Sequence, residues 1–128
     1  LQRLAEAWDG DRMDALLLVA ETVFARGYQG IGDFQMGPDG AMRRRGPTEV
    51  APYAFTGVQI LHPRLFQYAP EAPFSLNVLY DQAEASDRLY GLVHDGLWFH
   101  VGTPDDLEEA EQELYELGFR PDRTEELP

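Results

Sequence analysis

The segment DALLLVA, residues 14–20, decides the fold that the sequence predicts. It is a short continuous run of apolar residues, whereas a strand with one face in water alternates apolar and polar side chains. Such a run is typical of a strand that is covered on both faces, as in a parallel sheet. We therefore predict a sheet that holds this strand in its interior.

The residues before and after this segment predict a helix, a hairpin and a long strand. Apolar residues at helical spacing indicate a helix over 1–8, which an Asp-Gly-Asp sequence ends. GPDG at 37–40 predicts a tight turn, with AMRRR at 41–45 returning as the second strand of a hairpin. The longest strand candidate lies within 51–63, where Gly57 indicates a bulge or a close approach to the backbone.

The second half of the chain predicts a helix, a hairpin and a last helix. Ser75 can cap the first helix, whose apolar face comprises Leu76, Leu79, Tyr80 and Ala83. The stretch LYGLVHDGLWFHVG, residues 89–102, predicts a β-hairpin with a two-residue turn at Asp95-Gly96. Thr103 can cap the last helix and Pro104 can begin it, with a buried stripe of Leu107, Ala110, Leu114 and Leu117. The whole predicts an α/β fold, a mixed β-sheet with flanking helices, in a single domain over 1–128.

The predicted hairpin places Gly91 opposite His100. Trp98 and His100 then lie on one face, and the glycine leaves a gap beside the imidazole that the Trp98 ring lines. A gap beside a polar group, just before a helix N-terminus, suits a small anion or a metal ion. The alternative is a histidine satisfied by a backbone carbonyl, with Gly91 present only for strand twist.

The composition narrows the partners and the compartment. The chain has 128 residues, a formal net charge of -13 and a pI near 4.4, which argues against nucleic acid and anionic membranes as partners. Cysteine is absent, which excludes disulfides and agrees with a reducing compartment. The longest apolar run, Ala15–Ala20, is too short to span a bilayer, and no signal peptide is visible. We expect a cytoplasmic protein, and a chain that opens inside a helix without methionine is expected to be a piece of a longer one.

Three stretches carry a family resemblance: YAFTGVQILHPRLF at 53–66, PFSLNVLYDQA at 73–83, and LYGLVHDGLWFHVGTPDDLEEAE at 89–111. Together they resemble the C-terminal half of sugar-1-phosphate nucleotidyltransferases of the N-acetylmuramate-1-phosphate uridylyltransferase or mannose-1-phosphate guanylyltransferase type. The resemblance implies the second half of a nucleotide-diphospho-sugar transferase (Rossmann-like) fold. The N-terminal nucleotide-binding half, with its G-x-G-T-R-x-x-P loop, is absent from the sequence.

The resemblance also implies a reaction. Such enzymes join a nucleoside triphosphate to a sugar 1-phosphate, with Mg²⁺ bridging the phosphates, and release pyrophosphate for NDP-sugar and cell wall biosynthesis. None of the family's catalytic residues falls in these 128 residues, so we expect the piece alone to be inactive. Its expected partners are the two substrates and either the N-terminal half or a second copy. The alternatives are a non-catalytic module that binds a sugar phosphate or a subunit, and a plain structural α/β domain.

The family's sugar-binding positions can be carried over to this sequence. The resemblance assigns substrate-binding roles to Gly30, Thr56, Gly57 and Trp98. The metal position, aspartate in many relatives, is His100 here. Because Mg²⁺ prefers oxygen ligands, either the preference shifts toward Mn²⁺ or the ligand lies elsewhere.

The segment RRRGPTEV, residues 43–50, occupies the place of the family's glutamate-lysine-proline element, which holds the sugar phosphate. Strand alternation puts Arg43 and Arg45 on one face and Arg44 on the other. Arg43 or Arg45 can neutralise the phosphate, with a solvated basic strand end as the alternative. Asn77 can hydrogen-bond a sugar hydroxyl, although its place in the first turn of a helix explains it equally well.

Overall fold

The computed structural model describes residues 2–26, 28, 30–69, 73–95, 98–99 and 104–118. Five strands form a mixed sheet in the order β4-β3-β5-β1-β6, and two short strands pair separately as β2-β7. The elements are α1 (Gln2–Ala7), β1 (Ala15–Glu21), the 3₁₀ helix η1 (Thr22–Phe24), β2 (Ala25–Arg26), β3 (Phe34–Met36), β4 (Met42–Arg44), β5 (Tyr53–Leu61), the 3₁₀ helix η2 (Pro63–Tyr68), α2 (Asn77–Ala85), β6 (Leu89–Val93), β7 (Trp98–Phe99) and α3 (Pro104–Glu116). This arrangement confirms the predicted α/β class with a mixed sheet.

β1 is the interior strand that its apolar run predicts. It is antiparallel to β5 on one side and parallel to β6 on the other. Five of its seven residues are at most 1% exposed: Ala15, Leu16, Leu17, Val19 and Ala20. A strand that is buried on both faces carries apolar side chains on both, so its sequence does not alternate between apolar and polar residues.

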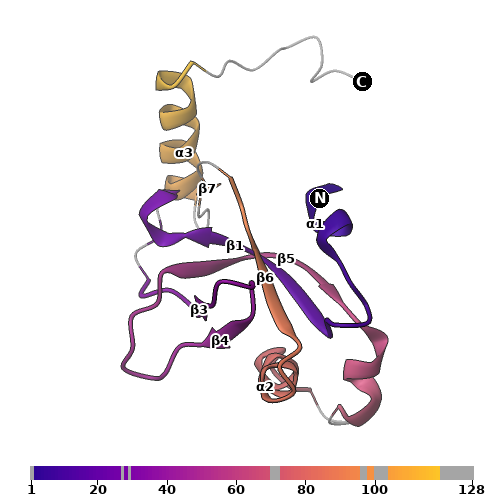
Figure 1. Ribbon diagram of the computed structural model, residues 1–128. Coiled ribbons are helices and arrows are strands. Elements are labelled where there is room, and N and C mark those ends of the chain that lie inside the picture. The colour runs from indigo at the N-terminus through magenta and orange to yellow at the C-terminus, as the bar shows by residue number, and fades with distance from the viewer. Residues whose placement is uncertain are drawn as a thin grey trace.

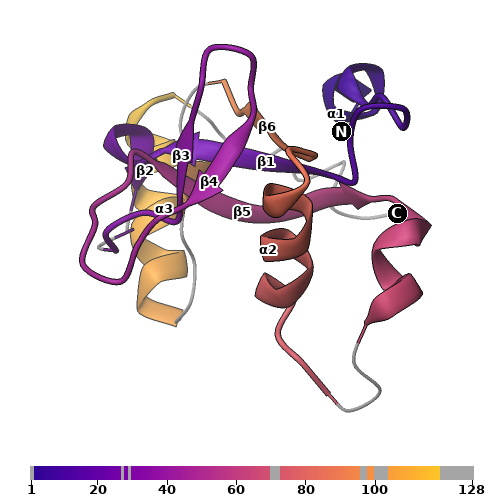
Figure 2. The ribbon, with the colours of Figure 1, turned by 60° about the horizontal axis from the view of Figure 1, so that its bottom comes forward.

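Helices cover both faces of the sheet (Figures 1 and 2). Leu17 of β1 packs in one cluster with Leu79 and Ala83 of α2. Its neighbour Leu16 points to the opposite face, where it packs in a second cluster with Leu4 of α1. Successive residues of one strand therefore supply both cores, as the period of two requires.

A buried carboxylate ties the start of β1 to two other segments. Asp14 accepts a hydrogen bond from Arg88 Nε at 2.8 Å and another from Arg64 Nε. Burial by itself would raise the pKa of Asp14, but the hydrogen bonds from Arg88 and Arg64 outweigh it and hold the pKa below its usual value. The cluster joins the chain ahead of β1 to η2 and to the residue that precedes β6.

Two local predictions are confirmed in the β3–β4 hairpin and in β5. The hairpin pairs Met36 with Met42 across the GPDG turn, in which Gly40 has φ +88°. In β5 the register against β1 shifts between Leu17 and Val19, opposite Gly57. Gly57 has φ +96°, which is the conformation of a bulge that favours glycine.

The predicted hairpin of 89–102 is wrong. β6 pairs in parallel with β1, so that Gly91 lies beside Leu17, and β7 pairs in parallel with β2, so that Trp98 lies beside Ala25. An isolated two-stranded hairpin is marginal, whereas pairing with β1 places β6 in the buried sheet. Gly96, Leu97 and His100 lie outside the described residues.

The gap predicted beside Gly91 is also absent. A Cβ on Gly91 would lie 2.3 Å from Met42 Sδ and 2.6 Å from Met36 Cε. The methionines of the β3–β4 hairpin therefore fill the space that a side chain at position 91 would need. The proposal of a ligand cavity opposite His100 loses its structural basis.

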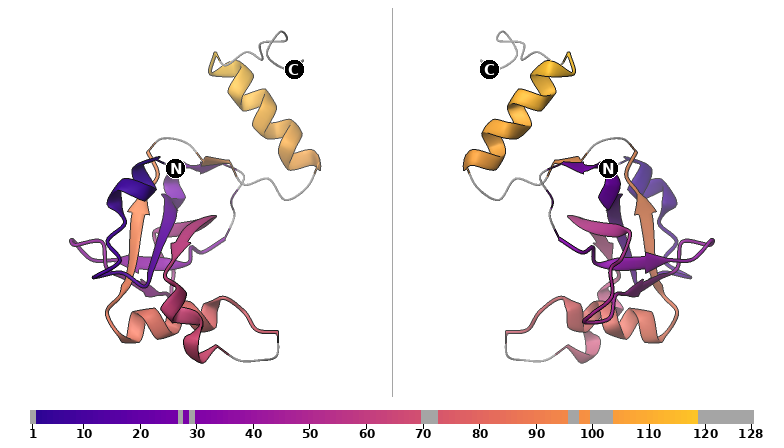
Figure 3. Two further views of the ribbon diagram at one scale, coloured as in Figure 1. Left: turned by 90° about the vertical axis from the view of Figure 1, so that its right-hand side faces the viewer. Right: turned by 90° about the vertical axis from the view of Figure 1, so that its left-hand side faces the viewer.

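The two longer helices bury less than the sequence predicts. α3 begins at Pro104 and buries Ala110, but Leu107 is 49% exposed and Leu117 is 55% exposed. The predicted buried stripe is wrong at both leucines, because α3 stands to one side of the sheet instead of lying on it (Figure 3). Leu76, which directly precedes α2, is likewise exposed, and Ser75 Oγ accepts the N–H of Asn77 at 3.2 Å. Within the described ranges, no helix is long and apolar enough to cross a membrane.

Candidate binding pocket

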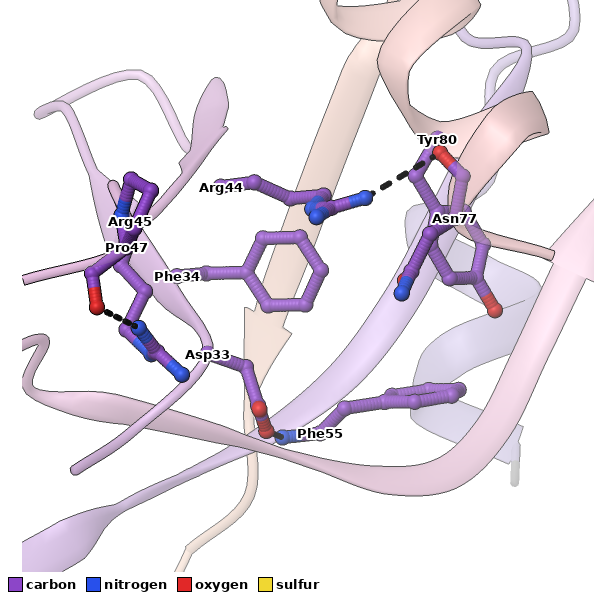
Figure 4. Close-up of a pocket in the computed structure, with 8 residues that line it drawn as sticks. All are labelled: Asp33, Phe34, Arg44, Arg45, Pro47, Phe55, Asn77 and Tyr80. Atoms are coloured by element: carbon purple, nitrogen blue, oxygen red, sulfur yellow. Dashed lines mark hydrogen bonds between the residues drawn. The ribbon is translucent and has the colours of Figure 1, made fainter. Parts of the chain in front are cut away.

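A cavity of about 460 Å³ opens between the end of the β3–β4 hairpin, β5 and α2 (Figure 4). This volume lies in the range typical of small-molecule sites. Its lining combines aromatic rings with charged and amide groups: Asp33, Phe34, Arg44, Arg45, Pro47, Phe55, Asn77 and Tyr80. These residues come from segments that are far apart in the sequence, and the packing of α2 against the sheet brings them together.

Aromatic rings form the apolar part of the pocket. Phe34 and Phe55 both meet the Tyr80 ring edge-on, with centroids 6.2 and 6.0 Å away. The Tyr80 hydroxyl donates to Gln59 Oε1 at 2.5 Å, and burial raises the pKa of Tyr80 against the opposing effect of that bond. Packing fixes these rings before any ligand arrives, which makes the surface preorganised.

Arg44 belongs to the pocket but is already paired. Its Nη1 lies 3.2 Å from the Asp81 carboxylate and 3.4 Å from the carbonyl oxygen of Asn77, both in α2. Its backbone N–H also donates to Glu84 Oε1 at 2.7 Å. Arg44 therefore holds α2 against β4, and Asp81 offsets much of its charge.

Arg45 contributes a positive charge that no described acidic side chain pairs with. Its Nε donates to the Gly32 carbonyl at 2.8 Å and its Nη1 to the Gly46 carbonyl at 2.9 Å. These neutral carbonyls orient the guanidinium without cancelling its charge. The Arg45 charge also contributes to the lowered pKa of Glu49, although no ion pair joins the two side chains. A guanidinium that is oriented in a pocket and has no ion-pair partner among the described residues is suited to bind a carboxylate or phosphate.

Arg43 lies away from the pocket. It makes two hydrogen bonds to Glu49, each of 3.1 Å, which raise the pKa of Arg43 and lower that of Glu49. The prediction that Arg43 and Arg45 lie on the same strand face is wrong. β4 ends at Arg44, so strand alternation does not extend to Arg45. Arg44, which the sequence placed on the other face, shares the pocket with Arg45 instead.

The remaining predicted site residues fall in two other places. Thr56 Oγ1 donates to the Leu18 carbonyl at 2.8 Å, so Thr56 and Gly57 both lie in the bulge between β5 and β1. Apart from its chain neighbours, no described residue has a heavy atom within 4 Å of a Cβ built on Gly57. Gly30 and Trp98 meet at Tyr28: a Cβ on Gly30 would lie 2.4 Å from the Tyr28 hydroxyl, and the Trp98 ring is 6.3 Å from the Tyr28 ring. Of all predicted sugar-side residues, only Arg45 and Asn77 line the cavity.

The described residues contain no group of three or more His, Cys, Asp or Glu side chains that could hold a metal ion. His100, the predicted metal ligand, lies outside them. Its role therefore stays a prediction.

Sequence reasoning missed the aromatic lining, and it weighed Asp33 as a ligand but favoured a structural role at a strand edge. Asp33 Oδ2 accepts the N–H of Phe55 at 2.8 Å. This carboxylate therefore binds the backbone at the edge of β5 and also lines the pocket. The sequence predicts Phe55 in a strand and Tyr80 on the apolar face of a helix, and the structure confirms both. No spacing in the chain indicates that their edges meet in one place.

The mixed α/β fold is consistent with the class of protein that the sequence resembles, the sugar-1-phosphate nucleotidyltransferases, and comparison with known proteins confirms the resemblance. The chain is 38% identical over 113 residues to N-acetylmuramate alpha-1-phosphate uridylyltransferase of Caulobacter vibrioides. The matched region covers 88% of this chain and 47% of that relative, so the chain spans about half the relative's length. No protein-family model matches the chain.

Proposed function

We propose that this chain is the sugar-phosphate-binding half of a sugar-1-phosphate nucleotidyltransferase. The complete enzyme would join a nucleoside triphosphate to a sugar 1-phosphate and release pyrophosphate. The similarity to a uridylyltransferase supports the reaction class. The observation that carries the assignment to this half is the Arg45 guanidinium, held by carbonyls in a pocket with aromatic walls.

The pocket chemistry fits a phosphorylated sugar. Arg45 can form charge-assisted hydrogen bonds to phosphate oxygens, and Asn77 and Asp33 can bond hydroxyl groups. The Phe34 and Phe55 rings supply apolar surface for the faces of a sugar ring. In such a reaction the protein acts mainly by positioning the two substrates and neutralising charge, which is the work these side chains can do.

The test uses a chimera in which residues 1–128 replace the matching segment of the Caulobacter relative. Pyrophosphate release is measured with UTP or GTP, a panel of sugar 1-phosphates, and Mg²⁺ or Mn²⁺. We expect activity in the chimera and none from the 128 residues alone. A folded chimera that releases no pyrophosphate with any combination would contradict the proposal and favour a non-catalytic binding module.

The role of Arg45 is tested in the same chimera. Arg45→Ala should raise KM for the sugar 1-phosphate about 10- to 100-fold, since a hydrogen bond to a charged group contributes about 1.5–3 kcal/mol. Arg43→Ala is the matched control, because Arg43 faces Glu49 outside the pocket, and it should leave KM within a factor of two or so. Thermal melting of each variant separates lost binding from lost folding.

A further inference from the structure

The Arg44 side chain extends from the sheet across the pocket to α2 (Figure 4). Arg44 is the last residue of β4 and pairs with Phe34 of β3, so the hairpin fixes its backbone. Its Nη1 lies 3.2 Å from the Asp81 carboxylate and 3.4 Å from the Asn77 carbonyl oxygen, which are about one helical turn apart. A side chain that starts from the rigid sheet therefore holds the beginning of α2.

The first turn of α2 has few other stabilising features. Asn77 is exposed, and the burial of the helix begins only at Leu79. Leu76, at the N-cap position, makes no side-chain hydrogen bond to the helix, and the first turn contains no acidic residue. Caps and acidic side chains are what usually stabilise a helix N-terminus. Ser75 Oγ accepts one N–H, that of Asn77, and Arg44 is the described side chain that ties this turn to the sheet.

The contact between Arg44 and Asp81 acts locally. The two side chains are 33% and 60% exposed, and ion pairs at such positions add little to the stability of a whole domain. A helix end, however, opens with a much smaller free energy than the whole fold, so a weak contact can decide how often it is ordered. The backbone N–H of Arg44 also bonds Glu84 Oε1, and this second link to α2 does not depend on the guanidinium.

We propose that Arg44 is a positioning residue, which orders the first turn of α2 and so presents Asn77 to the sugar phosphate in the pocket. The inference rests on the proposed function for the identity of that ligand. Arg44 acts through the helix, because Asp81 and the Asn77 carbonyl occupy its guanidinium, and Arg45 remains the group that binds the phosphate. An apparent dissociation constant rises as the binding-competent fraction of the free protein falls, whereas the bound complex stays the same.

The first test measures pyrophosphate release by the same chimera. Arg44→Ala should raise KM for the sugar 1-phosphate about 10-fold and leave kcat within a factor of about two, because the change falls on the free enzyme. Arg44→Lys should recover most of this loss, since Nη1 alone makes the contacts to α2 and an ammonium group can replace it. Asn77→Ala should also raise KM. Adding Arg44→Ala to it should produce little further change, because Arg44 acts through Asn77.

Asp81→Asn separates positioning from direct phosphate binding. If Arg44 positions the helix, the loss of its charged partner should raise KM about 2- to 5-fold, the equivalent of one exposed ion pair. A lower KM in Asp81→Asn would mean that Asp81 competes with the phosphate for Arg44, which would overturn the inference. Arg43→Ala is the matched control, because Arg43 pairs with Glu49 away from the pocket, and it should leave KM unchanged.

Amide hydrogen exchange in the unliganded chimera, followed by NMR, measures the positioning without any reaction. The N–H of Leu79 bonds the Leu76 carbonyl oxygen in the first turn at 2.9 Å. Arg44→Ala should speed its exchange about 10-fold, in proportion to the more frequent opening of the turn. The N–H of Arg88 bonds the Ala83 carbonyl oxygen at 2.8 Å at the other end of α2, and its exchange should not change.

Three further outcomes would overturn the inference. These are unchanged exchange at Leu79 in Arg44→Ala, a loss confined to kcat, and fully additive effects of Arg44→Ala and Asn77→Ala. Should Arg44→Ala fail to fold, Asp81→Asn provides the same two measurements with a milder change. A chimera that releases no pyrophosphate contradicts the proposed function, whereas faster exchange at Leu79 in that same protein still supports the positioning role of Arg44.

Discussion

The backbone of Gly32 lies directly against the backbone of Ala51. A Cβ on Gly32 would sit 2.0 Å from the Ala51 carbonyl oxygen, and Gly32 has φ +81°. The same Gly32 carbonyl receives Arg45 Nε, so this close approach sets the position of the guanidinium in the pocket. Only glycine meets both requirements, since any side chain here would strike main-chain atoms.

Gly32→Ala should therefore destabilise the chain by about 3 kcal/mol, from backbone strain together with a clash that no rotamer change relieves. Gly57→Ala is the matched control, because Gly57 also has positive φ, but beyond its chain neighbours no described residue comes within 4 Å of its added Cβ. It should cost about 1 kcal/mol, for strain alone. Urea unfolding followed by circular dichroism compares the two, and equal losses would contradict the close approach at Ala51.

Gly91→Ala tests the correction to the predicted ligand gap. The new methyl group would meet Met42 Sδ and Met36 Cε, which are the flexible ends of side chains, so the cost should be only about 1–2 kcal/mol. The double variant Gly91→Ala/Met42→Val replaces Met42 by a shorter side chain and so relieves the clash. Its loss of stability should therefore be smaller than the sum of the losses of the two single variants. A Gly91→Ala variant as stable as the parent would mean that the space at position 91 is open after all.

Asp14→Asn should destabilise the fold by about 2 kcal/mol at neutral pH, because it removes the charged partner of Arg64 and Arg88. Both guanidinium groups can still reach water, since their side chains are 36% and 28% exposed, which keeps the loss below that of a fully buried pair. The measurement is the free energy of unfolding of each protein in urea.

The same substitution should change the pH dependence. The folded-state pKa of Asp14 is lowered, so its contribution is present above the unfolded-state value and is lost as pH falls through the folded value. The parent should therefore lose stability below about pH 4, the region of an unperturbed aspartate, and Asp14→Asn should lose less over that range. Parallel acid unfolding curves for the two proteins would contradict a lowered pKa.

Tyr80→Phe should cost about 1 kcal/mol by removing the hydroxyl that donates to Gln59. The ring contacts with Phe34 and Phe55 remain, so the shape of the pocket should not change. Thermal unfolding measures the loss, and unchanged sugar-phosphate binding, measured calorimetrically, checks that the pocket is intact. A loss above about 3 kcal/mol would show that the hydroxyl does more than satisfy Gln59.

His100→Ala tests the predicted metal ligand in the active chimera. If His100 holds the ion, the concentration of Mg²⁺ or Mn²⁺ needed for half-maximal activity should rise at least about 10-fold, the usual effect of losing contacts around a metal. His62→Ala is the matched control, since His62 accepts the N–H of Arg64 in η2. An unchanged metal requirement in a folded His100→Ala protein would remove His100 from the metal site.

Much of the fold could be predicted because its signals are local. The apolar run at 14–20, the GPDG turn and Pro104 each act within a few residues, through burial, turn geometry and helix initiation. Gly57 predicts a bulge for the same reason, because the positive φ that a bulge requires, here +96°, depends on a single residue. Each of these features depends on residues that are neighbours in the chain, so it can be recognised from the sequence alone.

The pocket and the strand partners were decided by tertiary structure. Leu17 and Gly91 are distant in the chain, and their pairing left no room for the local hairpin that Asp95-Gly96 suggested. Arg45 lines the pocket and Arg43 does not. β4 ends at Arg44, so strand alternation does not determine the direction of the Arg45 side chain. By itself the sequence determined which segments are strands and helices, since local geometry and burial suffice for that. Which edges pair and which side chains meet depended on competition between segments that only the folded chain brings together.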